Sequence, residues 1–475
     1  MRALRFVLTS AFYGLAEISA RLIQFAALFF LARICTKDEY GQIGLLFTLQ
    51  QIVTILALGG MTEAMTGMLN EYRSRKQLPD LFSNVSKLMG VFAGLISLFY
   101  IIASVTIFQR HLANEPAGLY LSVLLCGLLL AYFRMSVSIH QLQEKHRRAV
   151  LLKTMPILFC YVFGLLGAIY TKGIFGFFAG CAMGLIIFVL MEKMSDNNQP
   201  KNKNALDLNL VKSLFKDSLP FLAVGIMGWL SGYGNNFFIK GFFSNIEVAE
   251  FTMVFNFNFV LLLVINSINQ VWAPRFYKIA SECSEEYLNK VNTLVNQGQF
   301  LAISVLSGMI LLYFQEGISI AGGNLAGYRS VHPYLVITCS SCVFLNLYYR
   351  SSSYFLLHRE GRLFMKIVLW TSLIGTGIWV FLMWKIGVWG IYLGFFLVMV
   401  MRGGVIFYHA SKKWRVKMSF FDIPLGLSIV GCGYGLSVAE HNLFLRTAYY
   451  IFAVSAMALV FYWCNRAKIK EYIGF

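Results

Sequence analysis

Long hydrophobic runs separated by short polar segments fill almost the whole sequence. About fourteen runs are long enough for a helix to cross a hydrocarbon core about 30 Å thick, which takes about 20 residues. Backbone groups in lipid must bond to one another, and the runs lack the alternation of barrel strands. We therefore predict an all-α, polytopic membrane protein. The predicted spans are residues 9–33, 41–67, 87–108, 117–139, 154–170, 174–191, 219–241, 248–272, 298–314, 334–357, 365–384, 388–409, 423–439 and 443–463.

The eight prolines agree with this division of the sequence. Each falls in a loop or near the end of a predicted span, where a helix tolerates proline best. They are Pro79, Pro116, Pro156, Pro200, Pro220, Pro274, Pro333 and Pro424.

Positive charges concentrate in every second polar segment. Of the 40 Lys and Arg residues, 28 fall in one set of alternating segments that includes both ends of the chain, 8 fall in the other set, and 4 lie inside spans. Lys and Arg mark the cytoplasmic side of membrane proteins. This asymmetry predicts an even number of spans with both termini in the cytoplasm, and it accounts for most of the net charge of +18 without a nucleic-acid partner.

The sequence predicts neither a cofactor nor a metal. Cys339 and Cys342 have the spacing of a redox or metal motif, but they lie inside a predicted span without a second pair, and the seven histidines form no cluster. The first hydrophobic run is longer than the core of a signal peptide and contains charges, so we expect it to be retained. A phosphate-binding loop motif is absent as well. The sequence therefore predicts no nucleotide-binding site of its own.

A polar stretch from Glu192 to Asp217, rich in Asn, Lys and Ser, reads as a cytoplasmic linker between two halves. The halves begin alike, since the turns Thr36–Gly41 and Ser244–Phe251 each carry acidic residues and an aromatic before a long span. This favours a parallel repeat, as in transporters whose substrate site lies between halves. The predicted parts are an N-terminal six-helix bundle (1–191), the linker (192–217), a C-terminal six-helix bundle (218–410), and an extra helix pair with a cytoplasmic tail (411–475).

The turn Thr36–Gly41 and the segment Ser218–Pro274, with Pro220 and Glu247, resemble the polysaccharide and O-antigen flippases. These belong to the multidrug/oligosaccharidyl-lipid/polysaccharide exporter superfamily. The resemblance implies two six-helix bundles around a central cavity plus two C-terminal helices. In lipid II flippases of this superfamily, the extra pair forms a lipid-facing groove.

The resemblance also implies a function. It implies a transporter, not an enzyme, that moves a polyprenyl-pyrophosphate-linked oligosaccharide (an O-antigen, capsule or exopolysaccharide repeat unit) across the bacterial inner membrane. The implied partners are membrane lipid, the anionic lipid-linked oligosaccharide and polysaccharide assembly proteins. The alternatives are a lipid II flippase, a cation-coupled drug or metabolite antiporter, and a membrane glycosyltransferase or polymerase. The short external loop around Gln315–Pro333 disfavours the enzymes.

Charged and amide side chains inside the spans are the candidates for a binding site, because charges deep in lipid must face protein or water. Glu17 and Arg21 lie one helical turn apart in the first span, and Gln24 follows them. They either line a cavity or form an ion pair that fixes the first span to its neighbours.

Three further arginines, Arg134, Arg350 and Arg402, lie near the cytoplasmic ends of their spans. They either extend to lipid headgroups or form a cationic cavity for an anionic lipid carrier, which Glu63 would tune. Asparagines of the seventh and eighth spans either line the cavity or pack helices together; at the first two of these positions many relatives have an Asp-Arg pair. The asparagines are Asn235, Asn236, Asn258, Asn266 and Asn269.

Overall fold

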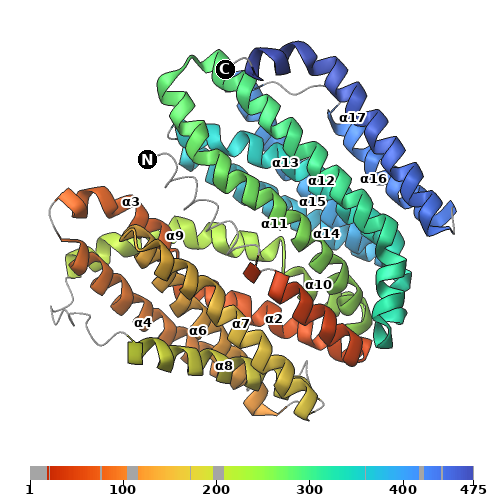
Figure 1. Cartoon of the computed structure of the whole chain (residues 1–475). Helices are drawn as coiled ribbons and strands as arrows, with labels where there is room; N and C mark the ends of the chain where they lie inside the picture. Colours follow the sequence, from red (N-terminus) through yellow and green to blue (C-terminus); the bar gives the residue numbers. More distant parts are fainter. Residues whose placement is uncertain are drawn as a thin grey trace. The chain divides into compact units, whose positions relative to one another are not determined.

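The computed structural model describes residues 19–20, 22–74, 77–103, 116–171, 173–195, 208–358, 360–416, 422–439 and 442–473. Within these ranges the chain is helical almost throughout and contains no strand (Figure 1). Among the described residues, eleven helices are long and apolar enough to cross a membrane, and Leu22–Ile34 and Leu443–Leu459 are shorter apolar helices. Every predicted span overlaps a helix, which confirms the polytopic all-α fold.

The chain divides into two compact units. The first unit comprises Met1–Leu31 with Asp38–Phe237, and the second comprises Ala32–Lys37 with Phe238–Phe475. The described helices of the first unit are Leu22–Ile34 (up to Leu31), α2 (Lys37–Leu58), α3 (Met61–Ser74), α4 (Leu78–Ala103), α6 (Ala117–Leu142), α7 (His146–Thr171), α8 (Ile174–Ser195), α9 (Leu208–Leu230) and the start of α10 (Asn235–Phe242). Those of the second unit are α11 (Asn245–Glu282), α12 (Glu285–Ala321), η2 (Gly323–Val331), α13 (His332–Leu357), α14 (Gly361–Ile386), α15 (Val388–Trp414), α16 (Asp422–Ala439) and α17 (Leu443–Ile473).

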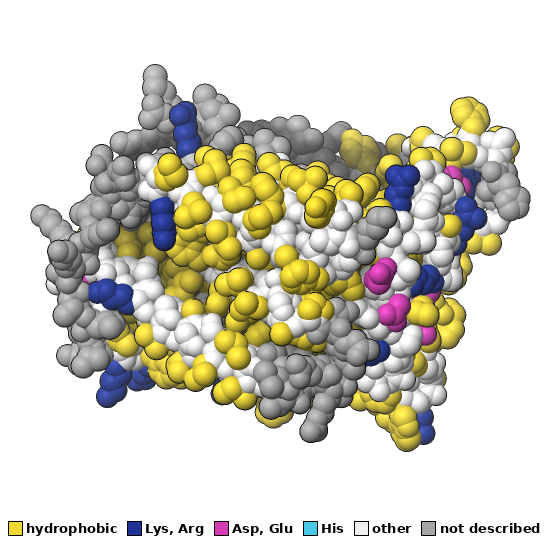
Figure 2. Space-filling view, turned by 90° about the horizontal axis from the view of Figure 1, so that it is seen from below, with side chains coloured by type: hydrophobic (Ala, Val, Ile, Leu, Met, Phe, Trp, Pro, Cys, Tyr) yellow, Lys and Arg dark blue, Asp and Glu magenta, His cyan; other side chains and the backbone are white. Residues whose placement is uncertain are grey.

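The surface of the protein carries the pattern expected of a membrane protein. Figure 2 shows hydrophobic side chains over much of the middle of one face, while Lys and Arg lie mainly toward its two ends. Many large apolar side chains are exposed, among them Leu95, Phe99 and Leu166, each more than half exposed. In water such exposure would be costly, and in a bilayer it is the lipid-facing surface.

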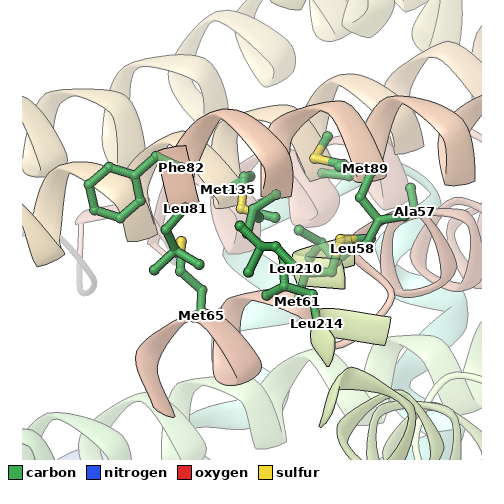
Figure 3. Packing of buried hydrophobic residues seen from close by; sticks show 13 residues of the cluster. Ala57, Leu58, Met61, Met65, Leu81, Phe82, Met89, Met135, Leu210 and Leu214 are labelled. Atoms are coloured by element: carbon green, nitrogen blue, oxygen red, sulfur yellow. The ribbon is translucent and has the colours of Figure 1, made fainter. Parts of the chain in front are cut away.

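A break at Gly59 and Gly60 divides the predicted second span into α2 and α3. Both glycines have positive φ, 56° and 73°, which only glycine adopts readily. A Cβ added to Gly60 would overlap the Ser218 carbonyl and lie 2.6 Å from the Leu222 nitrogen, so this turn packs directly on the backbone of α9. Figure 3 shows Leu58 and Met61, on either side of the break, close to Leu210 and Leu214 of α9. The glycines therefore redirect the chain so that α3 and α9 share one core.

Helices α7 and α8 pack through small residues. Gly176, Gly180 and Gly184 recur every fourth residue along α8, and a Cβ on Gly180 would lie 2.8 Å from the Phe163 carbonyl carbon of α7. In lipid, helices associate through such close packing, because burying apolar surface gives no advantage over contact with lipid tails. The stripe explains how two spans that are apolar all round form a specific pair.

Three prolines correct one sequence expectation. Pro156, Pro220 and Pro274 lie near the ends of apolar runs, as predicted, but inside the helices α7, α9 and α11. These helices continue beyond the apolar runs into polar sequence. Hydropathy marks where lipid contact ends, whereas the helix itself ends where its backbone hydrogen bonds end, so the two boundaries differ.

Candidate substrate pocket in the first unit

A cavity of about 310 Å³ lies within the first unit, between α2, α6, α7 and the helix that precedes α2. Its polar lining residues are three glutamines and two cations. They are Gln24, Gln50, Gln51, Arg134 and Lys153. The apolar part of the wall comprises Ala20, Leu130, Phe133, Val137, Leu152, Pro156, Ile157, Cys160 and Tyr161. The described lining residues thus carry two positive charges and no carboxylate.

The polar groups are held by neighbouring helices. The Nη2 atom of Arg134 on α6 donates a hydrogen bond to Oε1 of Gln51 on α2, at 3.3 Å. The adjacent Gln50 is only 3% exposed, and its Oε1 atom has no hydrogen-bond partner in the part of the chain that the structure describes. A buried amide oxygen without a partner is costly, so a ligand or water that donates to it would be stabilised there.

Pro156 lies inside α7 and lines the same wall. Proline has no backbone N–H, so the Leu152 carbonyl, four residues earlier, lacks its usual helical donor. Leu152 lines the cavity as well.

The sequence analysis identified part of this pocket. Gln24 and Arg134 are both in its lining, although they come from spans far apart in the sequence. Lys153 was not among the candidates, because it lies at the polar edge of its apolar run, where hydropathy gives no sign of an inward role. Glu17 and Arg21 lie outside the described residues.

Arg350 has an environment that neither sequence expectation anticipated. It is 4% exposed, and its Nη1 atom lies 3.8 Å from Oδ2 of Asp422, the first residue of α16. Its Nη2 atom donates to the Thr293 hydroxyl at 2.9 Å, while Gln297 donates to Asp422 at 3.0 Å. Arg350 therefore ties α13 to the extra helix pair by a buried ion pair, and each member of the pair is hydrogen-bonded to α12.

The remaining charged candidates are less deeply placed. Arg402 is part-buried on α15, and its Nη2 atom donates to the Ser372 hydroxyl of α14 at 2.7 Å. Glu63 is exposed on α3 and accepts a hydrogen bond from the Thr62 hydroxyl at 2.6 Å.

The asparagines at the start of α10 pack helices together. Asn236 donates to the Gly44 carbonyl at 3.2 Å and to the Thr48 hydroxyl at 3.0 Å, both on α2. Asn235 donates to the Gly232 carbonyl at 2.9 Å. Both side chains are buried, which suits neutral amides that join helices within the membrane.

The asparagines of α11 differ from one another. Asn266 accepts a hydrogen bond from the Tyr349 hydroxyl at 2.8 Å, and Asn269 donates to the Ile265 carbonyl of its own helix at 2.9 Å. Asn258 is 1% exposed, and neither polar atom of its amide has a partner among the described residues.

The two turns that begin the halves of the sequence are linked within the second unit. Lys37 Nζ lies 2.6 Å from Glu250 Oε1 and 5.2 Å from the centre of the Tyr328 ring. The Ser330 hydroxyl donates to the same carboxylate oxygen at 3.1 Å. The segment Ala32–Lys37 is therefore fixed to the second unit by an ion pair that joins the matching turns.

Comparison with solved structures places the fold among transporters. The lipid II flippase MurJ in an inward closed conformation matches with a TM-score of 0.73 and 11% identity, over 95% of this chain and 98% of that chain. An inward-facing multidrug resistance MATE family transporter matches with a TM-score of 0.65 and 14% identity, over 85% and 98%. A transporter of the same MOP superfamily from Pyrococcus furiosus, described by the reverse polarity of its binding pocket, matches with a TM-score of 0.58 and 11% identity, over 86% and 95%.

At sequence level, no curated protein matches the chain. A family model described as polysaccharide biosynthesis protein does match, over residues 8–280, more than half of the 475 residues. This confirms the family resemblance drawn from the sequence: the chain belongs to the polysaccharide biosynthesis protein family, with the fold of the MOP superfamily transporters.

Proposed function

We propose that the protein is a flippase for a polyprenyl-pyrophosphate-linked oligosaccharide, such as an O-antigen, capsule or exopolysaccharide repeat unit. It would move this lipid from the cytoplasmic to the outer face of the bacterial inner membrane. The observation that carries the proposal is the pocket of the first unit, with Arg134, Lys153 and three glutamines and no carboxylate in its described lining. Family membership and the similarity in fold to a lipid II flippase support the same class of substrate.

The pocket suits an anionic saccharide lipid in two ways. Arginine and lysine donate charge-assisted hydrogen bonds to phosphate oxygens, and the arginine fork matches them in geometry. Glutamine amides both donate to and accept from sugar hydroxyls. An anionic headgroup moving outward also gains about 2.3 kcal/mol per charge for each 100 mV of inside-negative potential that it crosses.

A cation-coupled drug antiporter is the main alternative of a different class. Its basis is that multidrug transporters are among the proteins of similar fold. A cationic substrate requires a negative pocket, and the described lining of this one is positive. The reverse pocket polarity attributed to the Pyrococcus furiosus transporter indicates that polarity varies within the superfamily. A lipid II flippase would need the same positive pocket, so the charge of the pocket does not separate the two kinds of flippase.

Arg134→Ala tests the proposal. We expect surface glycan to fall at least about tenfold when this variant complements a strain that lacks the gene, because one charge-assisted hydrogen bond contributes about 1.5–3 kcal/mol. Lipid-linked oligosaccharide should accumulate on the cytoplasmic side. Arg134→Lys should retain part of the activity, since it keeps the charge and loses the fork.

The matched control is Arg148→Ala, which removes an arginine of α7 that lies near Glu192 and outside the pocket lining. It should leave surface glycan unchanged at equal protein level. Normal glycan in Arg134→Ala, or new sensitivity of the gene deletion to cationic drugs with an unchanged glycan profile, would contradict the proposal.

A second prediction concerns orientation. We expect a reporter that is active only in the periplasm to be silent after Pro200 and at Phe475 and active after Asn324. A reporter that is active only in the cytoplasm should give the opposite pattern. The reason is the distribution of 28 basic residues in one set of segments and 8 in the other. The reverse result in both reporters would overturn the orientation and, with it, the direction of transport.

A further inference from the structure

The second unit contains a larger cavity of about 590 Å³, where α12 begins and α15 ends. It shares no lining residue with the pocket of the first unit. Its wall combines carboxylates, cations, neutral polar groups and one tryptophan. The lining residues are Glu285, Glu286, Asn289, Lys290, Thr293, Lys413, Trp414 and Arg415.

One charge of each sign in this wall is left unneutralised. The Oε1 atom of Glu286 lies 3.6 Å from the Nζ atom of Lys290, one helical turn away. Lys413 forms an ion pair with Glu360, which is outside the lining. Among the described residues, Glu285 and Arg415 belong to no ion pair. Both are exposed, and they belong to different elements, the first residue of α12 and the residue that follows α15. The cavity therefore presents a separated negative and positive group.

Two neutral lining residues, Trp414 and Asn289, are held by contacts within the second unit. Trp414 is 7% exposed and stacks on His358, with ring centres 4.8 Å apart and planes within 5°. Its carbonyl accepts a hydrogen bond from Asn289 at 3.3 Å, and the Asn289 amide oxygen accepts one from the Tyr354 hydroxyl. A ligand entering the cavity would meet groups that are already ordered, which lowers the entropic cost of binding.

Arg415 is held in an unusual conformation. Its φ of 52° and ψ of 31° are left-handed, a region that glycine or asparagine adopts more readily at the end of a helix. Non-glycine residues in this region concentrate at functional sites, where the surroundings maintain them. Here the conformation makes a guanidinium part of the cavity wall.

We propose that this cavity binds the headgroup of a zwitterionic phospholipid, specifically phosphoethanolamine. Arg415 would bind the phosphate and Glu285 the ammonium group, because these two lining charges belong to no ion pair among the described residues. The cavity lies at the end of two spans and includes a tryptophan, the residue typical of the headgroup region. A polyprenyl phosphate carries no ammonium group, so the carboxylates would disfavour it.

Native mass spectrometry of the purified full chain, titrated with defined lipids, tests this proposal. We expect phosphatidylethanolamine to bind at least about tenfold more tightly than phosphatidylglycerol, polyprenyl phosphate or phosphatidylcholine, whose quaternary ammonium cannot donate a hydrogen bond. Glu285→Gln should abolish this preference while phosphatidylglycerol still binds. Arg415→Gly should lower the affinity for every phospholipid about tenfold. Glycine should keep the turn, because it adopts the left-handed region freely.

The control variants are Glu282→Gln and Lys412→Gln, which remove exposed charges next to the cavity but outside its lining. They should bind phosphatidylethanolamine as the unaltered protein does. Unchanged lipid preference in Glu285→Gln, or polyprenyl phosphate bound as tightly as phosphatidylethanolamine, would overturn the proposal. The readout is binding of a phospholipid, so its failure is distinct from any failure of the transport proposal.

Discussion

Arg350→Ala should lower the free energy of unfolding by about 3–5 kcal/mol, the usual cost of removing one partner of a buried ion pair. Arg350 and Asp422 are 4% and 6% exposed, so removal of the guanidinium leaves the carboxylate buried without its cationic partner. The lost ion pair is the one that joins α16 of the extra helix pair to α13. Unfolding of the purified protein in detergent by increasing dodecyl sulfate, followed by tryptophan fluorescence, measures the change.

The double variant Arg350→Met with Asp422→Leu separates charge from packing. It should be more stable than Arg350→Ala, because it leaves no uncompensated charge in the interior. Lys413→Ala, which removes a half-exposed partner of Glu360, should change the free energy by about 1 kcal/mol or less. An equal decrease in the free energy of unfolding in Arg350→Ala and Lys413→Ala would show that the buried ion pair does not stabilise the packing of α16.

A second set of contacts joins the extra helix pair, α16 and α17, to the rest of the second unit. Arg446, at the start of α17, is 3% exposed and pairs with Glu316 of α12, while the Tyr450 hydroxyl donates to the Val305 carbonyl at 2.8 Å. Since α12 and α13 both belong to the second unit, ion pairs and a hydrogen bond join the pair to that unit at separate levels. We therefore expect α16 and α17 to move with the second unit during transport.

Hydropathy predicted the fold because a bilayer imposes one requirement on every span, and that requirement can be read along the chain. The candidate pocket was partly predictable for the same reason. Gln24 and Arg134 are polar residues inside apolar runs, so each had to face protein or water. Which helices bring them together depends on contacts distant in sequence. Lys153 was missed because it lies at the edge of its apolar run, where a charge needs no protein partner.

The partners of Arg350 were beyond the sequence for a different reason. Asp422 lies at the first turn of a predicted span, where an acidic residue usually serves as a helix cap or contacts headgroups. Nothing in its local sequence indicates that it is buried against an arginine 72 positions earlier in the chain. A charge near the end of a span therefore has at least three outcomes: headgroup contact, a cavity wall or a buried pair. Only the fold decides among them.

The second large expected effect concerns the break between α2 and α3. Gly60→Ala should lower the free energy of unfolding by about 2–5 kcal/mol. About 1–2 kcal/mol comes from placing a Cβ at φ 73°, and about 1–3 kcal/mol from its overlap with the backbone of α9. Gly387→Ala is the control for backbone strain, because Gly387 also has a positive φ, 63°, but has nothing within 4 Å of the added Cβ. Its ψ of −137° is a conformation that other residues rarely adopt, so the variant should lose about 1–3 kcal/mol from the backbone alone. The same dodecyl sulfate titration measures both variants. Equal losses would mean that backbone conformation alone requires glycine at position 60, and that the close packing of this turn on α9 adds nothing to stability.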